Sequence, residues 1–163
     1  MYRIGQATDI HQLVKNRPLV IGGVEIPFEF GLLGHSDADV LTHVIIDAII
    51  GALGLGDIGS HFPDTDLKYK NISSLKLLEA TFLLLEQANY QVNNLDCTVL
   101  LEEPLLAPYI PKMRQVIATI LKTDPSLINI KATRGEKLGF VGRQEGIVAQ
   151  AIVLLERKSN EKS

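Results

Sequence analysis

At 163 residues the chain has the length of a single domain and is long enough to bury a substantial core. Its composition, with 46% hydrophobic, 6% aromatic and 21% charged residues, is that of a globular protein with aliphatic packing and not of a disordered chain. The net charge of -3, without a cluster of Lys and Arg, argues against a nucleic-acid partner, because a phosphate backbone needs several cations on one face.

Features of secretion or membrane insertion are lacking as well. Cys97 is the only cysteine, so no intramolecular disulfide can form, which suits a reducing compartment. The first residues have neither a signal nor a transit composition, and no apolar run approaches the about 20 residues of a membrane span. We therefore expect no membrane partner and a cytoplasmic location, or the plastid stroma if the chain is a processed form.

The first part of the chain predicts a strand, a hairpin and a buried helix. Residues 2–13 have strand character, and residues 18–27, in which two glycines separate Val/Ile runs, predict a hairpin. Ser36 and Asp39 have the spacing of a capping box, and the apolar run that follows to Leu53 predicts a helix buried on most sides.

The remainder predicts a loop and then alternating helices and strands. Polar residues 57–71 indicate a loop over a site, and the Leu spacing of residues 73–88 indicates an amphipathic helix. A further helix is expected at 111–122, and strands at 90–101, 127–133 and 147–156. This order favours one α/β (α+β) domain over residues 1–157, a two-layer sandwich of a mixed four- to five-stranded sheet with helices on one face, and a polar tail at 158–163.

Asp9, His11 and His43 are candidate metal ligands. Residues two apart on a strand share a face, so Asp9 and His11 converge with His43 if the strand and the helix meet. Two imidazoles and a carboxylate are a usual zinc donor set that leaves a fourth position open. The alternative for any single histidine is a buried, hydrogen-bonded core residue.

Two carboxylates lie at helical spacing from His43. Asp39 is four residues before it and Asp47 four after it, so either could orient the imidazole from behind. Asp39 could equally be a helix N-terminal charge. Asp47 is expected to have a hydrogen-bonded partner, since an unpaired carboxylate in so apolar a helix is costly.

A second group of polar residues occupies positions 131–146. The segment begins as a strand and becomes a Gly-rich turn whose backbone N–H groups could bind phosphate. Glu136 could hold a hard cation such as Mg2+ that bridges phosphate oxygens. The alternative is a solvated, charged loop.

Taken in order, these motifs resemble the 2-C-methyl-D-erythritol 2,4-cyclodiphosphate synthase family over residues 3–155. The matching segments are Arg3-Ile4-Gly5, Asp9-Ile10-His11, Ile21-Gly22-Gly23, Gly34-His35-Ser36-Asp37-Ala38-Asp39-Val40, Gly56-Asp57-Ile58-Gly59, Phe62-Pro63-Asp64-Thr65-Asp66, Glu136-Lys137-Leu138-Gly139-Phe140 and Gly142-Arg143.

The resemblance implies a lyase of the non-mevalonate isoprenoid pathway. It would convert 4-diphosphocytidyl-2-C-methyl-D-erythritol 2-phosphate, a small cytidine diphosphate substrate, into the cyclic diphosphate and CMP. It would be a homotrimer with active sites at the subunit interfaces. Asp9, His11 and His43 would bind Zn2+, and Glu136 would match the position associated with Mg2+ or Mn2+.

The same resemblance assigns residues to the substrate. His35, Thr133 and Arg134 are the catalytic candidates. Substrate contacts would come from Ser36, Asp57, Ile58, Gly59, Phe62, Pro63, Asp64, Thr65, Asp66, Leu101, Pro104, Leu105, Ala107, Ala132, Thr133, Gly135, Phe140 and Arg143.

The chain departs from the family pattern near both substrate segments. Arg134 and Gly135 stand where the family usually has Thr, and Leu105 replaces a Lys in the cytidine loop. We expect Arg134 either to contact the diphosphate or to turn to solvent while Thr133 substitutes. Two alternatives follow: a zinc-dependent phosphohydrolase with His35 as general base, and a non-catalytic trimeric nucleotide-binding relative.

Overall fold

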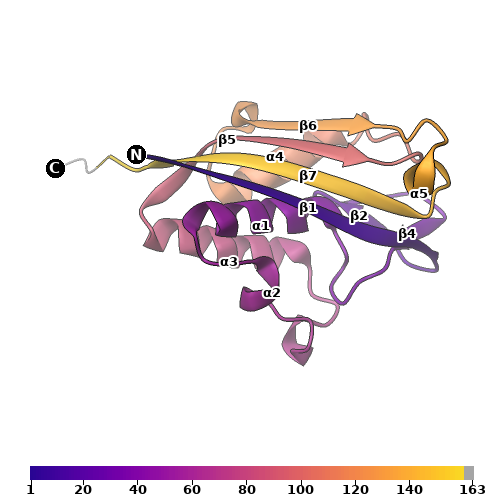
Figure 1. The fold of residues 1–163 in the computed structure, drawn as a ribbon, viewed down its shortest axis with the longest axis horizontal. Coiled ribbons are helices and arrows are strands. Elements are labelled where there is room, and N and C mark those ends of the chain that lie inside the picture. Colours follow the sequence, from indigo (N-terminus) through magenta and orange to yellow (C-terminus); the bar gives the residue numbers. More distant parts are fainter. Residues whose placement is uncertain (160–163) are drawn as a thin grey trace.

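The computed structural model describes residues 1–159, which form two layers (Figure 1). One layer is a five-stranded sheet, which confirms the predicted mixed sheet. Among the described strands, β5 and β6 alone pair in parallel. The strand order β4-β1-β7-β5-β6 comprises β4 (Phe30–Leu32), β1 (Tyr2–Lys15), β7 (Gly146–Arg157), β5 (Tyr90–Leu100) and β6 (Ile128–Thr133).

The other layer is helical and covers one face of the sheet. Helix α1 (Val40–Leu53) packs on β1 and β7, with α3 (Ser74–Gln87) beside it and α4 (Ile110–Leu121) beside α3 (Figure 1). Because helices cover only one face of the sheet, buried and exposed side chains alternate along β1. Ala7 is buried towards α1, whereas Ile4 is 71% exposed on the open face.

A glycine sets the distance between α1 and β1. A Cβ atom added at Gly5 would lie 1.9 Å from the Ala48 carbonyl oxygen in α1. Only a residue without a side chain therefore allows this approach. The close contact carries the first turn of α1, with His43, towards the strand that bears Asp9 and His11.

The start of α1 differs from the prediction. Ser36 is not the cap: Ala38 has a φ of 58°, outside the helical region, so the helix cannot begin before it. Asp39 is the N-cap, and its side chain accepts a hydrogen bond from the Thr42 N–H. Gly54 ends the helix with a φ of 72°.

Three segments were incompletely described by the sequence pattern. The predicted hairpin forms, as β2 (Leu19–Ile21) and β3 (Val24–Ile26), but as a separate two-stranded sheet. The short edge strand β4 was not predicted. The expected loop at 57–71 contains α2 (Ile58–His61) and a 3-10 turn, η1 (Leu67–Tyr69).

Smaller elements complete the described chain: η2 (Pro125–Leu127) and α5 (Gly139–Gly142). Strand β7 is followed by Lys158, whose backbone N–H donates to the Asn89 carbonyl, so the predicted polar tail begins as an ordered extension of the strand. Residues 160–163 of that tail lie outside the described residues. Within the described part, no helix has the length and apolarity to cross a membrane.

Candidate metal centre and active site

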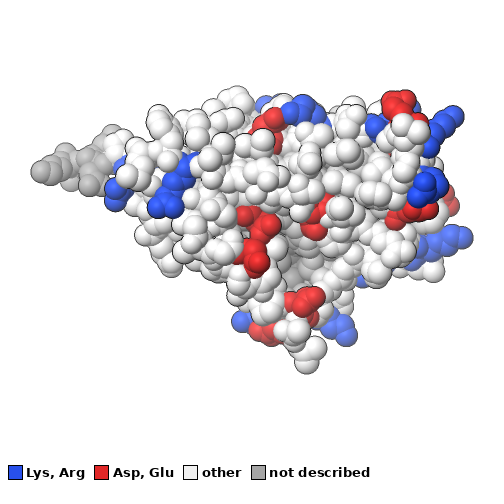
Figure 2. Space-filling model, in the orientation of Figure 1, with Lys and Arg blue, Asp and Glu red and all other residues white. Residues whose placement is uncertain are grey.

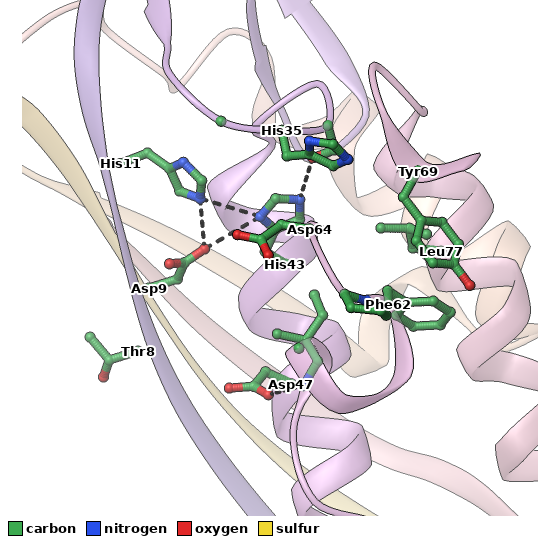
Figure 3. Close-up of a pocket in the computed structure, with 15 residues that line it drawn as sticks. Thr8, Asp9, His11, His35, His43, Asp47, Phe62, Asp64, Tyr69 and Leu77 are labelled. Carbon is green, nitrogen blue, oxygen red and sulfur yellow. Dashed lines mark hydrogen bonds and ion pairs between the residues drawn. The ribbon is translucent and has the colours of Figure 1, made fainter. Parts of the chain in front are cut away.

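Asp9, His11 and His43 converge at the junction of β1 and α1 (Figure 3). Asp9 Oδ2 lies 3.0 Å from His11 Nε2 and 3.4 Å from His43 Nδ1. The two ring nitrogens are 3.3 Å apart. The two strand residues, Asp9 and His11, therefore converge with the helical His43, as the sequence predicted.

A backbone carbonyl orients His11. Its Nδ1 lies 2.7 Å from the Leu33 carbonyl oxygen, and because a carbonyl only accepts, this nitrogen carries the ring proton. In the neutral ring, Nε2 then has a free lone pair directed at Asp9 and His43. Leu33 follows the edge strand β4, so a strand that the sequence pattern did not reveal helps to orient a candidate ligand.

Two serine hydroxyls, and not the predicted carboxylates, lie beside the Nε2 atom of His43. Its Nε2 is 2.8 Å from Ser74 Oγ and 3.0 Å from Ser36 Oγ. The expectation that Asp39 or Asp47 could orient this ring is wrong for both. Asp47 instead accepts a hydrogen bond from the Ile58 N–H at 2.8 Å, which confirms that it has a partner.

Asp39 is fully buried and joins the hairpin to α1. Its carboxylate accepts from the N–H groups of Gly22 at 2.8 Å and Gly23 at 2.7 Å. It also accepts from the Thr42 N–H at 3.0 Å and the Thr42 hydroxyl at 2.7 Å. Asp39 therefore lies at the helix N-terminus, as the alternative to a role behind His43 predicted, and it acts there as the N-cap.

The electrostatics of the three donors are coupled. Burial works against the Asp9 carboxylate, yet hydrogen bonds with His11 and His43 hold its pKa well below the usual range. Burial likewise works against a charged His11, but the hydrogen bonds to Asp9 and Leu33 raise its pKa. The carboxylate thus stays ionised and favours a positive charge beside it.

The donor spacing fits a tetrahedral ion. Ligands about 2.0–2.1 Å from a zinc ion at tetrahedral angles lie roughly 3.3 Å from one another. The three observed separations are 3.0, 3.3 and 3.4 Å. One carboxylate and two imidazoles therefore fit a divalent metal such as zinc and leave a fourth position open.

The donors lie at one wall of a pocket of about 440 Å³. Its lining contains ten of the residues that the sequence assigned to the substrate or the metal: Asp9, His11, His35, Ser36, His43, Ile58, Gly59, Phe62, Pro63 and Asp64. Sequence reasoning did not place Thr8, Gly34, Asp47, Tyr69 and Leu77 in it. Tyr69 packs edge-on against Phe62, at a centroid distance of 5.6 Å, which no spacing pattern would reveal.

The pocket is acidic. Acidic side chains gather around the hollow in the face shown in Figure 2, and the lining includes Asp9, Asp47 and Asp64. Among the described residues that line it, none is Lys or Arg. A polyanionic ligand would therefore be repelled unless a cation occupied the site.

Two further predicted residues cap short turns at the rim. Asp57 caps α2 by accepting from the Ser60 N–H at 2.8 Å, and hydrogen bonds from Ser60 lower its pKa. Asp66 caps η1, and its carbonyl lies 3.3 Å from His35 Nε2. Thr65 lies between the two turns. None of Asp57, Thr65 and Asp66 lines the pocket itself.

The second predicted group assembles elsewhere, where β5 and β6 end. The Leu101 N–H donates to the Thr133 carbonyl at 3.0 Å. The Gly135 N–H donates to Glu102 Oε2 at 3.0 Å, a contact that sequence reasoning missed. The remaining predicted residues of this end are Pro104, Leu105, Ala107, Ala132, Arg134, Glu136, Phe140 and Arg143; Leu105 is 60% and Phe140 38% exposed.

The metal donors and the residues at the ends of β5 and β6 lie at opposite ends of one row of paired residues that runs across the sheet. Asp9 pairs with Ala149, Ala149 with Val99, and Val99 with Ala132. The row crosses three strand-to-strand steps of about 4.8 Å, or roughly 14 Å. Within a single chain the two groups therefore do not form a common pocket.

A two-layer α/β fold that presents an Asp-His-His donor set, able to hold a metal ion, at the wall of an acidic pocket is the arrangement of an enzyme active site. A family model described as the YgbB family matches residues 2–156. The chain is 57% identical to the 2-C-methyl-D-erythritol 2,4-cyclodiphosphate synthase of Geobacillus sp. (strain WCH70), over 97% of this chain and 100% of that protein. It is 56% identical to the Bacillus subtilis (strain 168) synthase, over 96% and 99%. The chain belongs to the YgbB family, and its function is that of a 2-C-methyl-D-erythritol 2,4-cyclodiphosphate synthase, a lyase of isoprenoid biosynthesis.

Solved structures agree with this assignment. The Plasmodium falciparum IspF in complex with CDP has a TM-score of 0.85 and 35% identity, over 97% of each chain. The bifunctional IspDF of Campylobacter jejuni has a TM-score of 0.92 and 42% identity, and this chain spans 42% of its length. The resemblance inferred from the motifs is therefore confirmed.

Proposed function

We propose that Asp9, His11 and His43 hold Zn2+ and that the adjoining pocket binds the methylerythritol part of 4-diphosphocytidyl-2-C-methyl-D-erythritol 2-phosphate. The observation that carries this proposal is the tetrahedral spacing of the three donor atoms in a pocket lined by carboxylates and no described cation. When bound, the metal supplies positive charge that attracts a phosphoryl group and stabilises charge developing on it.

The chain's residues then orient the substrate. Ser36 and His35 lie beside the donors and can donate hydrogen bonds to phosphate oxygens. Ile58, Phe62 and Pro63 line the pocket from the 57–71 segment, where they can cover the apolar part of the methylerythritol and exclude water.

The reaction is an in-line phosphoryl transfer. An oxygen of the substrate's own 2-phosphate forms a bond to the β-phosphorus, and the bond from that phosphorus to the CMP oxygen breaks. The products are the cyclic diphosphate and CMP, and no protein nucleophile is needed. The chief contribution of the protein is to fold a polyanion back on itself, which requires charge compensation and alignment.

We further propose a homotrimer in which the β5–β6 end of one subunit completes the pocket of its neighbour. The roughly 14 Å between the two residue groups within one protomer supports this. In that arrangement the segment from Leu101 to Ala107 would bind cytidine. Glu136 would hold Mg2+ or Mn2+ with the diphosphate, while Thr133 or Arg134 would contact the transferring group. Gly135, Phe140 and Arg143 would complete that end.

One assay tests the proposed reaction. Purified protein is incubated with the diphosphocytidyl substrate and Mg2+, and the products are followed by phosphorus NMR. We expect CMP and the cyclic diphosphate in equal amounts. Inorganic phosphate or an uncyclised phosphate product would instead support the hydrolase alternative, and nucleotide binding without turnover would support the non-catalytic one. The cytoplasm, or the stroma for a processed form, stays our expected compartment, consistent with the unpaired Cys97.

A further inference from the structure

We propose that Ser74 and Asp37 are positioning residues that present the Nδ1 atom of His43 to the metal. This inference rests on the proposed metal site, and it assigns a role to two side chains outside the donor set. The relay consists of three groups in sequence: the imidazole of His43, the hydroxyl of Ser74 and the carboxylate of Asp37.

The central hydroxyl of the relay is closed to solvent. Ser74 is 0% exposed, and its Oγ lies 2.8 Å from His43 Nε2. The same Oγ hydrogen-bonds Asp37 Oδ1, and the Ser74 N–H donates to Asp37 Oδ2 at 2.9 Å. Asp37 Oδ1 also accepts from the Asp39 N–H at 3.1 Å. The carboxylate is thus fixed by donors from two segments.

The direction of the hydrogen bonds follows from the donor count. An ionised carboxylate only accepts, so the single hydroxyl hydrogen of Ser74 is donated to Asp37. Ser74 Oγ must then accept from His43, which requires the ring hydrogen to be on Nε2. The lone pair of the neutral ring is consequently on Nδ1, the atom that faces Asp9 and His11 at 3.4 and 3.3 Å.

Ser36 is a weaker candidate for the same task. Its Oγ is 3.0 Å from His43 Nε2 and accepts from the Ala38 N–H at 3.2 Å. No described carboxylate accepts its hydroxyl hydrogen, so its orientation is not imposed in the same way. Its hydroxyl therefore remains able to turn towards a substrate phosphate.

The relay also joins the metal site to the segment over the pocket. Ser74 is the first residue of α3, and only two residues separate it from the end of the 57–71 segment. The Asn71 N–H donates to the His35 carbonyl at 2.8 Å, and the Asp37 N–H donates to the Ile72 carbonyl at 3.1 Å. The end of this segment is therefore held in register with the turn that precedes α1.

The test compares Ser74→Ala with the matched control Ser73→Ala in the full-length protein. Ser73 is the neighbouring, exposed serine, and it caps α3 by accepting from the Leu75 N–H at 3.3 Å. Zinc affinity is measured by competition with a chromophoric chelator. We expect Ser74→Ala to weaken zinc binding by about 10- to 100-fold, the range typical of the loss of a side chain that hydrogen-bonds a metal ligand. Ser73→Ala should remain within about twofold of the unmodified protein, since its hydroxyl accepts from the Leu75 N–H and bonds none of the three candidate ligands.

Imidazole nitrogen NMR of the unmodified, metal-free protein provides a second readout that needs no variant. We expect neutral His43 to carry its proton on Nε2. Protonation on Nδ1 would overturn the relay, as would unchanged zinc affinity in folded Ser74→Ala. Equal losses in Ser74→Ala and Ser73→Ala would also overturn it, since they would indicate a general effect at the helix end. If the unmodified protein bound no zinc at these residues, the proposed metal site itself would fail, a result distinguishable from the others.

Discussion

The carboxylate of Asp47, in the middle of α1, accepts a hydrogen bond from the backbone N–H of Ile58 at 2.8 Å. This bond ties the first residue of α2 to the buried helix beneath it. Both residues line the pocket. The placement of the 57–71 segment therefore depends on a side chain of the rigid helix that also carries His43.

Replacement of Asp47 by Leu should loosen this segment without disturbing the metal donors. The Ile58 N–H would lose its acceptor, so we expect a rise in KM of about tenfold and a loss of unfolding free energy of about 1–3 kcal/mol. Zinc content should not change. Asp47→Asn, which keeps an acceptor oxygen, is the control; equal KM values for Asp47→Leu and the unmodified enzyme would contradict the role.

Asp9→Asn should remove the metal and the activity together. The substitution keeps the shape but takes away the charge that compensates the ion, so we expect zinc affinity to fall by more than about 100-fold. Elemental analysis after dialysis measures the bound zinc. Asp64→Asn is the control, because Asp64 lines the same pocket but is outside the donor group. Retention of zinc by Asp9→Asn would refute the ligand assignment.

Asp39→Ala should be among the most destabilising single changes in this chain. It leaves four donors, from Gly22, Gly23 and Thr42, without their acceptor, and all but the Gly23 N–H are buried. We expect a loss of about 3 kcal/mol or more, since each unsatisfied buried group costs about 1–3 kcal/mol. Urea denaturation followed by circular dichroism measures it, and Asp124→Ala, which removes the cap of an exposed turn, should cost at most about 1 kcal/mol.

Arg134→Thr should affect catalysis but not stability. Arg134 is exposed and makes no hydrogen bond or ion pair with another described residue. Thermal unfolding should therefore shift by no more than about 0.5 kcal/mol. If Arg134 contacts the diphosphate in the proposed trimer, kcat/KM should fall about tenfold and should depend less on salt concentration. Unchanged turnover and substrate affinity would eliminate that contact and favour Thr133.

Cys97 should be unreactive in the folded protein. Burial, reinforced by the charge of Asp96, raises the pKa of its thiol to about 12. We therefore expect slow reaction with a disulfide reagent at pH 8 and fast reaction in urea. The folded-state pKa exceeds the unfolded value of about 8.5, so the folded protein holds this proton more tightly than the unfolded chain. The resulting stabilisation is fully present below about pH 8.5 and is lost as the pH rises towards 12. Fast labelling without denaturant would show that the strand opens readily.

Local patterns determined much of this molecule. The two-residue spacing of Asp9 and His11 placed both on one face of a strand, and the uniform apolarity of residues 40–53 indicated a helix buried on most sides. Such properties depend on the backbone repeat of a single element. They were therefore correct without knowledge of what each element packs against.

Packing between distant segments decided the rest. Ser74 approaches His43 from 31 residues away because α3 begins beside α1, and Leu33 orients His11 from a strand too short to have a recognisable pattern. Asp39 and Asp47 had suitable spacing from His43, yet both side chains found backbone N–H groups of other segments. Helical spacing places a side chain on a face, whereas its partner depends on which element lies against that face. Only the tertiary structure supplies that information.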